Sequence, residues 1–471
     1  MGGRPVVIVS NRGPVSFRRD DAGALVARRG AGGLVSGIAP LVRDTDTLWI
    51  AAAFSAGDRE MSKDGVIDVE GFHIHLLDVD DKTWDLHYNA VCNEALWFAH
   101  HGLWDPVYAP SWPRGWAEAE DGPWQAHREV NHRFARAVID HAPADAAVLV
   151  QDYHLCLLAP LLREARPDLR LVHFAHTPFA TPEWLHMLPA GPRHELLEGL
   201  AAHHACGFHT ARWAEDFEAC CEVAGVAPPQ RFVAPLGPDE GDIGGVARSA
   251  ACDAALDELE GAVGDRSLIV RVDRIELSKN LLRGFDAYET LLEDARWHDR
   301  IVFAALVYPS RVGVPAYDHY RSAVSRRVDD INDRFGTDSW QPILYDDTDD
   351  FPRSIAALRR YDVLLVNPIR DGLNLVAKEG AMVNERDGLL VLSPEAGAWA
   401  ELAGAAIPCQ PFDISDTAAA IAAARIWSSN QLAGVRLVAA AWSRRLRSAR
   451  VSRSISSADA IAAAVSLMSN G

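Results

Sequence analysis

The chain has 471 residues, of which 49% are hydrophobic and 24% are charged, and its formal net charge is −19. These values are typical of an ordinary globular protein, and the length predicts two or three domains with full hydrophobic cores. The acidic balance disfavours broad nucleic-acid binding, so anionic ligands would have to be held by local arginines and lysines.

The cysteines and the first residues predict a cytoplasmic protein. There are seven cysteines and no CxxC pair, and an odd number without metal spacing indicates reduced thiols. The first apolar run, at 5–9, follows directly on Met1-Gly2-Gly3-Arg4, which leaves no room for a signal peptide, and no apolar run is long enough to span a membrane. We therefore expect neither a membrane nor a nucleic-acid partner, and leave association into a homo-oligomer open.

Short apolar runs alternate with helical patterns along the chain. Ten of these runs are predicted strands, at 5–10, 47–53, 72–77, 146–151, 170–175, 231–235, 267–273, 300–307, 361–366 and 388–393. This alternation predicts an α/β fold with parallel sheets covered by helices on both faces. Pro, Gly and acidic residues cluster at 235–241 and separate two halves. We predict Rossmann-like domains over 1–238 and 239–450, and a terminal helix over 451–471 that packs back toward the first domain.

One group of residues invites a metal interpretation. His203, His204, Cys206 and His209 lie within seven residues. The segment is predicted to pass from a helix into a strand, where alternate side chains point apart. Packed and surface histidines are therefore the favoured interpretation.

The strand Leu268–Val272 runs into a loop that carries Arg274 and Lys279. Ser278 is a predicted cap for the next helix, whose apolar positions 281, 282, 285, 288, 291 and 292 have helical spacing. Arg274 and Lys279 would then flank the start of a helix, where both suit the oxygens of a pyrophosphate. The alternative is two surface cations on a solvated loop.

A second anion element follows the apolar run Val363–Val366. The segment Arg370–Glu379 contains a glycine turn that leads into an amphipathic helix, so unpaired N–H groups and the helix dipole would favour an anion. Asp371 and Glu379 add two carboxylates that can accept from sugar or ribose hydroxyls. Phosphate and polyol recognition side by side predict a nucleotide-sugar site.

These elements belong to a longer set of motifs. The set comprises Ser10-Asn11-Arg12, Gly32-Gly33-Leu34, Tyr88-Asn89 with Asn93 and Leu96-Trp97, Asp152–Leu155, His176–Phe179 with Thr181-Pro182-Glu183, Arg274 with Lys279, Arg311, and Asp371–Glu379. In this order, along nearly the whole chain, they resemble the retaining glycosyltransferases that make trehalose 6-phosphate. The resemblance implies a GT-B architecture, in which two Rossmann-like domains face a cleft. It also implies transfer of glucose from GDP- or UDP-glucose to glucose 6-phosphate.

The resemblance further implies a role for each matching residue. On the donor side, Arg274 and Lys279 would hold the pyrophosphate with help from Asn374, Leu375 and the Gly32-Gly33 loop, and Glu379 would bind the ribose. Asp371 would contact the transferred glucose, and His176 would lie near the reacting carbon. On the acceptor side, the implied residues are Arg12, Tyr88 and Arg311 for the phosphate, Trp97 beside it, and Asp152 for hydroxyls. No protein nucleophile, metal or other cofactor is implied.

Three departures from the family pattern leave alternatives open. The usual Arg-Leu-Asp-Tyr-x-Lys-Gly appears as Arg274–Asn280, which keeps the charges at the same spacing. Ala51-Ala52-Ala53 stands where a further aromatic is common, which leaves room for another phosphorylated acceptor such as glycerol 3-phosphate or a pseudo-sugar phosphate. Asp346 and Asp347 favour guanine over uracil, because a carboxylate can accept two parallel bonds from guanine. A non-catalytic sugar-phosphate-binding paralogue is disfavoured because the donor-site charges are present.

Overall fold

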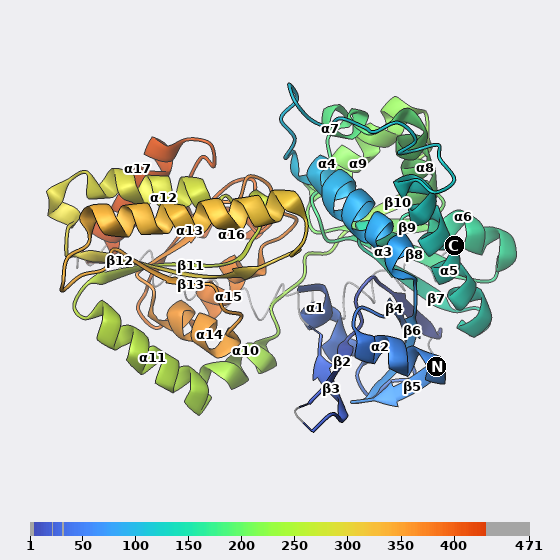
Figure 1. Ribbon diagram of the computed structural model, residues 1–471, viewed down its shortest axis with the longest axis horizontal. Coiled ribbons are helices and arrows are strands. Elements are labelled where there is room, and N and C mark those ends of the chain that lie inside the picture. The colour runs from blue at the N-terminus through green and yellow to red at the C-terminus, as the bar shows by residue number, and fades with distance from the viewer. Residues whose placement is uncertain (1–3, 21, 31–32, 430–471) are drawn as a thin grey trace. The chain divides into compact units, whose positions relative to one another are not determined.

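The computed structural model describes residues 4–20, 22–30 and 33–429. Within this part the chain divides into two compact units, unit 1 up to Leu236 and unit 2 from Gly237 onward (Figure 1). The terminal helix predicted over 451–471 lies outside the described residues. No helix of the described part has the length and apolar character needed to cross a bilayer.

Unit 1 is built on an eight-stranded sheet. Its strand order is β10 (Gln230–Val233), β9 (Ala205–Phe208), β8 (Arg170–Ala175), β7 (Ala147–Gln151), β1 (Val6–Val9), β4 (Leu48–Ala52), β6 (Phe72–Leu77) and β5 (Val66–Val69). All neighbours are parallel except the edge strand β5, which pairs antiparallel with β6. A separate antiparallel hairpin joins β2 (Val15–Arg19) to β3 (Leu25–Arg29).

Helices cover both faces of this sheet. They are α1 (Gly33–Val42), α2 (Ala56–Met61), α3 (Asp81–Asp85), α4 (Trp97–His101), α5 (Pro123–His141), α6 (Leu158–Ala165), α7 (Pro182–His186), α8 (Ala190–Ala201) and α9 (Ala211–Ala224), with a π-helix, η2 (Leu86–Leu96), and 3-10 turns η1 (Ser62–Asp64) and η3 (Tyr153–Leu155). Along β1, Val7 and Val9 pack in one core and Ile8 in the other. The central strands are continuous apolar runs because both of their faces are buried.

Unit 2 contains a six-stranded sheet that is parallel throughout. Its order is β13 (Ile343–Asp346), β12 (Ile301–Pro309), β11 (Ser267–Ile275), β14 (Val363–Val366), β15 (Leu389–Leu392) and β16 (Ala406–Pro408). Numbered along the chain, this is the doubly wound order 3-2-1-4-5-6 of dinucleotide-binding folds. The predicted fold class, α/β with parallel sheets in two Rossmann-like domains, is confirmed.

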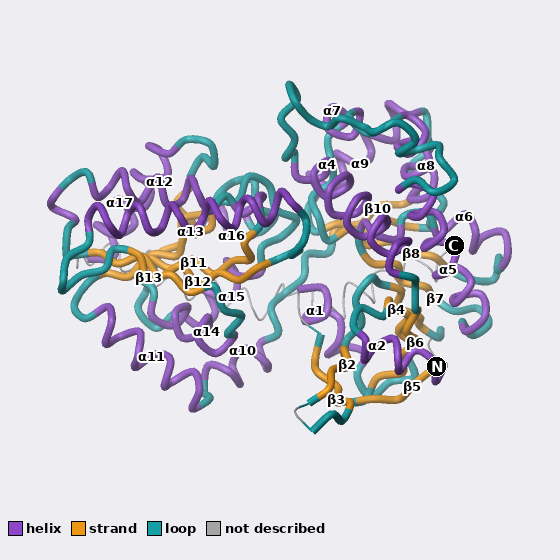
Figure 2. The backbone as a smooth tube through the Cα atoms, in the orientation of Figure 1, coloured by secondary structure: helices purple, strands orange, loops and turns teal. Residues whose placement is uncertain are grey.

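Figure 2 shows helices on both sides of the unit 2 sheet. One layer holds α12 (Leu281–Leu292), α13 (Pro315–Phe335) and α17 (Ile414–Ser429), and the other holds α10 (Glu240–Ala247), α11 (Ala250–Val263) and α14 (Phe351–Arg360). The remaining elements are α15 (Leu375–Val383), α16 (Trp399–Leu402) and the 3-10 turns η4 (Leu277–Lys279), η5 (Ala295–Trp297) and η6 (Ala403–Ala405). One core unites the two faces, with Phe285, Phe303 and Ile355 fully buried.

Each sheet has a topological switch point, where neighbouring strands connect to opposite sides. It lies between β1 and β7 in unit 1 and between β11 and β14 in unit 2. Ligands of such folds bind at the carboxyl ends of the strands at this point. Arg12 and Asp152 follow β1 and β7, and Arg274 and Asp371 lie at the ends of β11 and beyond β14. The topology therefore positions the predicted site residues.

The prediction that Ser278 caps the helix after β11 was wrong. Asn280, with φ +61°, is the N-cap of α12, and Ser278 lies in η4, where its carbonyl accepts a hydrogen bond from the Ile369 amide at 2.8 Å. The helix starts later because one 3-10 turn intervenes. That turn fixes the loop after β11 to the loop after β14.

Candidate active site

Lys279 lies at the centre of the charged groups at the unit 2 switch point. Its Nζ is 2.7 Å from Asp371 Oδ2 and 3.3 Å from Asp273 Oδ1, and its side chain is only 12% exposed. Burial alone would lower the pKa of Lys279, but Asp371 and Asp273 raise it above its ordinary value. The ammonium is therefore a fixed positive charge at all working pH values.

The loop after β14 is held in shape by its own side chains. Asn374, with φ +72°, caps α15 by accepting a hydrogen bond from the Ala377 amide at 3.1 Å, and its Nδ2 donates to Asp371 Oδ2 at 3.1 Å. Leu375 begins the helix. The predicted residues Lys279, Asp371 and Asn374 are thus brought together, at the N-terminus of a nine-residue helix whose dipole favours an anion.

Two further arginines join this cluster from the ends of β11 and β12. Arg274 Nη1 and Arg311 Nη1 lie 2.9 and 2.7 Å from Glu276 Oε1. Arg274 is the more accessible, with 43% of its side chain exposed against 7% for Arg311. A guanidinium that keeps one side in solvent can take a phosphate in its fork.

Glu379 lies on α15 and is partly buried. Burial, with a smaller contribution from Asp242, raises the pKa of its carboxyl to about 7, although Lys279 opposes the shift. Glu379 therefore changes charge near neutral pH. An ionised carboxylate is a stronger hydrogen-bond acceptor than a protonated one.

At the unit 1 switch point, Arg12 rests on an aromatic cluster. Its guanidinium lies 4.7 Å from the centre of the Phe54 ring, and its Nη2 donates to the Tyr88 hydroxyl at 3.4 Å. Tyr88 in turn stacks on Trp84 at 5.5 Å and meets Phe54 edge-on at 5.4 Å. The structure thus brings Arg12 and Tyr88 together, as a cation and a phenol that can both bind a phosphate.

The sequence interpretation missed Phe54 in this cluster. The feature of the sequence that could have indicated Phe54 is its position directly after Ala51-Ala52-Ala53, at the end of β4. The three alanines are at most 5% exposed, so their side chains pack in the core and do not enlarge an open pocket. The suggestion of a different acceptor, which depended on them, loses its support.

Asp152 and His176 lie together at the ends of β7 and β8. Asp152 has φ +66°, a strained conformation for a residue other than glycine, and its Oδ1 accepts a hydrogen bond from the His176 amide at 3.2 Å. His176 Nε2 is 2.9 Å from Gln151 Oε1. Burial, and then His173, lower the pKa of His176 to about 3, so the imidazole is neutral and acts through hydrogen bonds.

Trp97 is linked to Tyr88 through two intervening rings. Its indole lies 5.7 Å from Tyr153, which is 4.0 Å from His154, and His154 stacks on Tyr88 at 6.0 Å. Gly33 is the first residue of α1, and Gly32 lies outside the described residues.

The acids that favoured guanine are engaged elsewhere. Asp346 Oδ2 is 2.9 Å from Arg353 Nη1, and Asp347 Oδ2 is 2.7 Å from Arg321 Nη2. A carboxylate already paired with arginine is a poor partner for a base edge, so the argument for guanine weakens.

The histidines considered for a metal make contacts with the backbone. His203 Nδ1 lies 3.0 Å from the Leu200 carbonyl, and His204 Nδ1 accepts from the Leu171 amide at 3.0 Å. His209 packs instead beside His176, with ring centres 5.2 Å apart.

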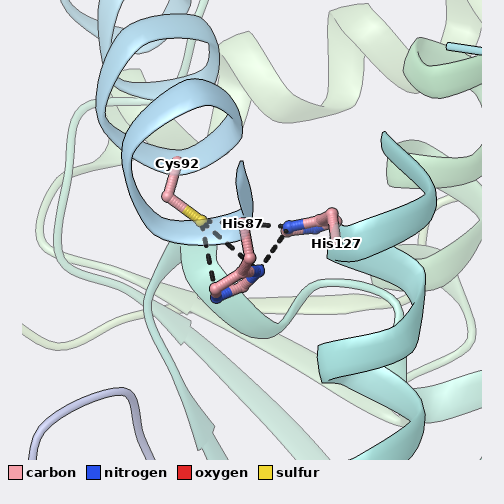
Figure 3. A group of neighbouring side chains, drawn as sticks. All are labelled: His87, Cys92 and His127. Atoms are coloured by element: carbon pink, nitrogen blue, oxygen red, sulfur yellow. Dashed lines mark hydrogen bonds between the residues drawn. The ribbon is translucent and has the colours of Figure 1, made fainter. Parts of the chain in front are cut away.

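A different buried group is found between η2 and α5 (Figure 3). His87 Nδ1 and His127 Nδ1 are 3.0 Å apart, which is a hydrogen-bond distance. Cys92 Sγ is 4.0 Å from His87 Nδ1, 3.8 Å from His87 Nε2 and 3.9 Å from His127 Nδ1. The three side chains are buried, one nitrogen or sulfur atom of each lies within 4.8 Å of the others, and they connect the π-helix to α5.

The family model for glycosyltransferase family 20 matches residues 4–433. A bifunctional trehalose-6-phosphate synthase/phosphatase from Thermoproteus tenax is 31% identical over 450 residues, 90% of this chain. The alignment covers 59% of that relative, so the chain spans less than two thirds of its length.

Two solved structures are similar over nearly their whole length. One, described as trehalose-6-phosphate from E. coli bound with UDP-2-fluoro glucose, superposes with a TM-score of 0.83 at 26% identity, over 98% of this chain and 99% of that one. The other is an alpha,alpha-trehalose-phosphate synthase (UDP-forming) from Burkholderia xenovorans in complex with glucose-6-phosphate. It gives a TM-score of 0.81 at 26% identity, over 98% and 100% of the two chains.

Proposed function

The chain belongs to glycosyltransferase family 20, with the GT-B architecture of two Rossmann-like domains, and from that membership we propose that it is a trehalose-6-phosphate synthase. It transfers glucose from UDP-glucose to the anomeric hydroxyl of glucose 6-phosphate, with retention, and releases UDP. The observation that carries the proposal is the cluster of Arg274, Lys279 and Asp371 at the unit 2 switch point.

The donor site follows from this cluster. The leaving group is a diphosphate whose charge grows as the glycosidic bond breaks, and preorganised cations stabilise such charge without reorganising during the reaction. Arg274 and Lys279 supply the cations, and the N-terminus of α15 behind Asn374 supplies the dipole. Asp371 accepts from hydroxyls of the transferred glucose, and Glu379 accepts from the ribose.

The acceptor site follows from the Arg12 cluster in unit 1. Arg12 and Tyr88 bind the phosphate of glucose 6-phosphate, with Trp97 nearby, and we assign Arg311 to the same phosphate. Asp152 accepts hydrogen bonds from the acceptor hydroxyls. Its unusual backbone conformation, with a positive φ, sets the direction of its side chain. The relative from Burkholderia, crystallised with glucose-6-phosphate, supports this choice of acceptor.

The chemistry needs no covalent enzyme intermediate. The acceptor hydroxyl attacks on the face from which UDP departs, and its proton passes to an oxygen of the leaving phosphate. Asp371 is held by Lys279 and Asn374, which suits an orienting group better than a nucleophile. His176, being neutral, contributes a hydrogen bond near the reacting carbon and no charge.

We also propose the cytoplasm as the site of this activity. All seven cysteines are buried free thiols, which is consistent with a reducing compartment.

Release of nucleoside diphosphate tests the function. The chain is incubated with UDP-, GDP- or ADP-glucose against glucose 6-phosphate, glycerol 3-phosphate or no acceptor. We expect release with UDP-glucose and glucose 6-phosphate together. Release only with GDP-glucose would show that the donor nucleotide carries guanine and not uracil. Release only with glycerol 3-phosphate would show that the acceptor is not glucose 6-phosphate. Absence of release in every combination would contradict the synthase assignment.

A further inference from the structure

Glu276 is a fully buried carboxylate at the end of β11, with an exposed fraction of 0%. Its Oε1 is contacted by three donors: Arg274 Nη1 at 2.9 Å, Arg311 Nη1 at 2.7 Å and Ser310 Oγ at 3.0 Å. Arg274 lies on β11, whereas Ser310 and Arg311 follow β12. One carboxylate oxygen therefore joins the ends of two neighbouring strands.

The two arginines on this oxygen have different ligands in the proposed reaction. In that reaction Arg274 binds the donor diphosphate, and Arg311 binds the acceptor phosphate. We propose that Glu276 is a positioning residue that fixes these two guanidiniums relative to each other and thereby couples donor binding to acceptor binding. This inference rests on the proposed function, because it needs both phosphates.

Electrostatics explains why a carboxylate is required at this position. Two guanidiniums with Nη1 atoms within 3 Å of one oxygen repel each other unless an anion lies between them. Burial alone would raise the pKa of Glu276, but Arg274, Arg311 and Lys279 lower it to about 2. The carboxylate is therefore ionised throughout the working pH range, and the bridge between the arginines persists.

The geometry also leaves room for the arginines to adjust. Glu276 Oε2 is buried and has no hydrogen-bond partner among the described residues, so it can accept a second N–H when a guanidinium turns toward a phosphate. Arg311 is the more constrained of the two, because its backbone has φ +48° and its guanidinium lies 5.2 Å from the centre of the Tyr317 ring. Arg274 is then the member expected to turn toward its ligand.

Binding of each ligand, alone and together, tests the coupling. In the unmodified chain, titration calorimetry should show that UDP tightens the binding of glucose 6-phosphate. Glu276→Gln removes the charge at constant shape. It should weaken both ligands by about tenfold or more, because each arginine loses a charged partner, and should abolish the mutual enhancement. Glu276→Asp keeps the charge with a shorter reach and should retain part of the enhancement.

Glu289→Gln is the matched control. Glu289 on α12 also receives two arginines, Arg327 and Arg334, and its side chain is 18% exposed. We expect it to lose thermal stability while both ligand affinities and their enhancement stay unchanged. A general cost of removing a glutamate from an arginine pair is thereby separated from an effect on the site.

The outcomes distinguish this inference from the function beneath it. If the unmodified chain binds neither UDP nor glucose 6-phosphate, the proposed function fails and this inference fails with it. If both bind but Glu276→Gln weakens only one of them, or lowers the melting temperature alone, the coupling role is overturned. If Glu276→Gln does not fold, Glu276→Asp decides. Unchanged enhancement in that variant would show that the contact of Oε1 with both arginines does not carry the coupling, and failure of both variants to fold would show that the carboxylate serves stability only.

Discussion

Lys279 is a single charge held between two carboxylates before any ligand arrives. Because Asp371 and Asp273 keep it ionised and fixed, in the proposed reaction it would stabilise the departing diphosphate with little reorganisation. We expect Lys279→Ala to lower kcat by about 10²–10³, as loss of one preorganised donor does elsewhere. Steady-state UDP release measures this. The exposed Lys63, on η1, provides the control substitution, and a loss of less than about threefold in Lys279→Ala would place the lysine away from the diphosphate.

Glu379 gives this site a dependence on pH. The pKa of its carboxyl rises from an ordinary 4.5 to about 7 in the folded chain, so the folded state binds a proton that the unfolded state releases. The stability that this proton provides is complete below pH 4.5 and is lost as the pH rises through about 7.

Chemical unfolding at several pH values tests this behaviour. The unfolding free energy of the unmodified chain, relative to that of Glu379→Gln, should fall between pH 5 and pH 8 by no more than about 3 kcal/mol. Affinity for UDP-glucose should change in the opposite direction, because the ionised carboxylate accepts ribose hydroxyls better. A constant difference between the two chains across this range would show that Glu379 is ionised in the fold.

Among the elements, the loop after β14 depends on a close approach of two backbones. Asp371 and Ala396 form an isolated parallel bridge, and the Gly397 amide donates to the Asp371 carbonyl at 3.0 Å. A Cβ at position 397 would overlap the Gly372 carbonyl oxygen. Glycine at 397 is therefore needed for the loop that carries Asp371 and Asn374.

Gly397→Ala should displace this loop. We expect a loss of about 1–3 kcal/mol in stability from the overlap, together with weaker UDP-glucose binding. Gly261→Ala in α11 is the control, because no atom lies within 4 Å of a Cβ there, and alanine should stabilise that helix by roughly 0.5–1 kcal/mol. If Gly397→Ala were as stable as the unmodified chain and bound donor equally well, the close approach would have no structural role.

At the scale of the whole molecule, most of the proposed donor residues and most of the proposed acceptor residues come from different units. Donor residues follow β11 and β14, and Arg12, Tyr88 and Asp152 belong to unit 1. Hydrogen exchange should therefore show that UDP alone protects amides around 274–280 and 371–377, whereas glucose 6-phosphate protects those around 10–12 and 152–154. Protection of the unit 1 segments by UDP, with none in unit 2, would reverse the assignment of the donor.

The sequence by itself determined the fold class, and it predicted most of the charged residues that the structure brings together at the two switch points. Each of the ten predicted strand segments overlaps a strand, because the buried strands of a parallel sheet are continuous apolar runs that local pattern reveals. Six strands of the described residues were not among the ten segments. A strand at β9 was predicted only from the passage of helix into strand at 203–209, and β2, β3, β5, β13 and β16 were not predicted. At β5 the pattern is weak because side chains alternate between exposed and half-buried along an edge strand.

Only the tertiary structure decided which of these residues meet. Ser278 has the chemistry of a helix cap, yet a 3-10 turn moves the cap to Asn280, because the carbonyl of Ser278 is bonded to the loop after β14. The contact of Phe54 with Arg12, the ion pairs of Asp346 and Asp347, and the bridge at Glu276 all join residues far apart in sequence or in different elements. Local propensity records what one segment prefers, whereas these contacts depend on the order of strands across each sheet.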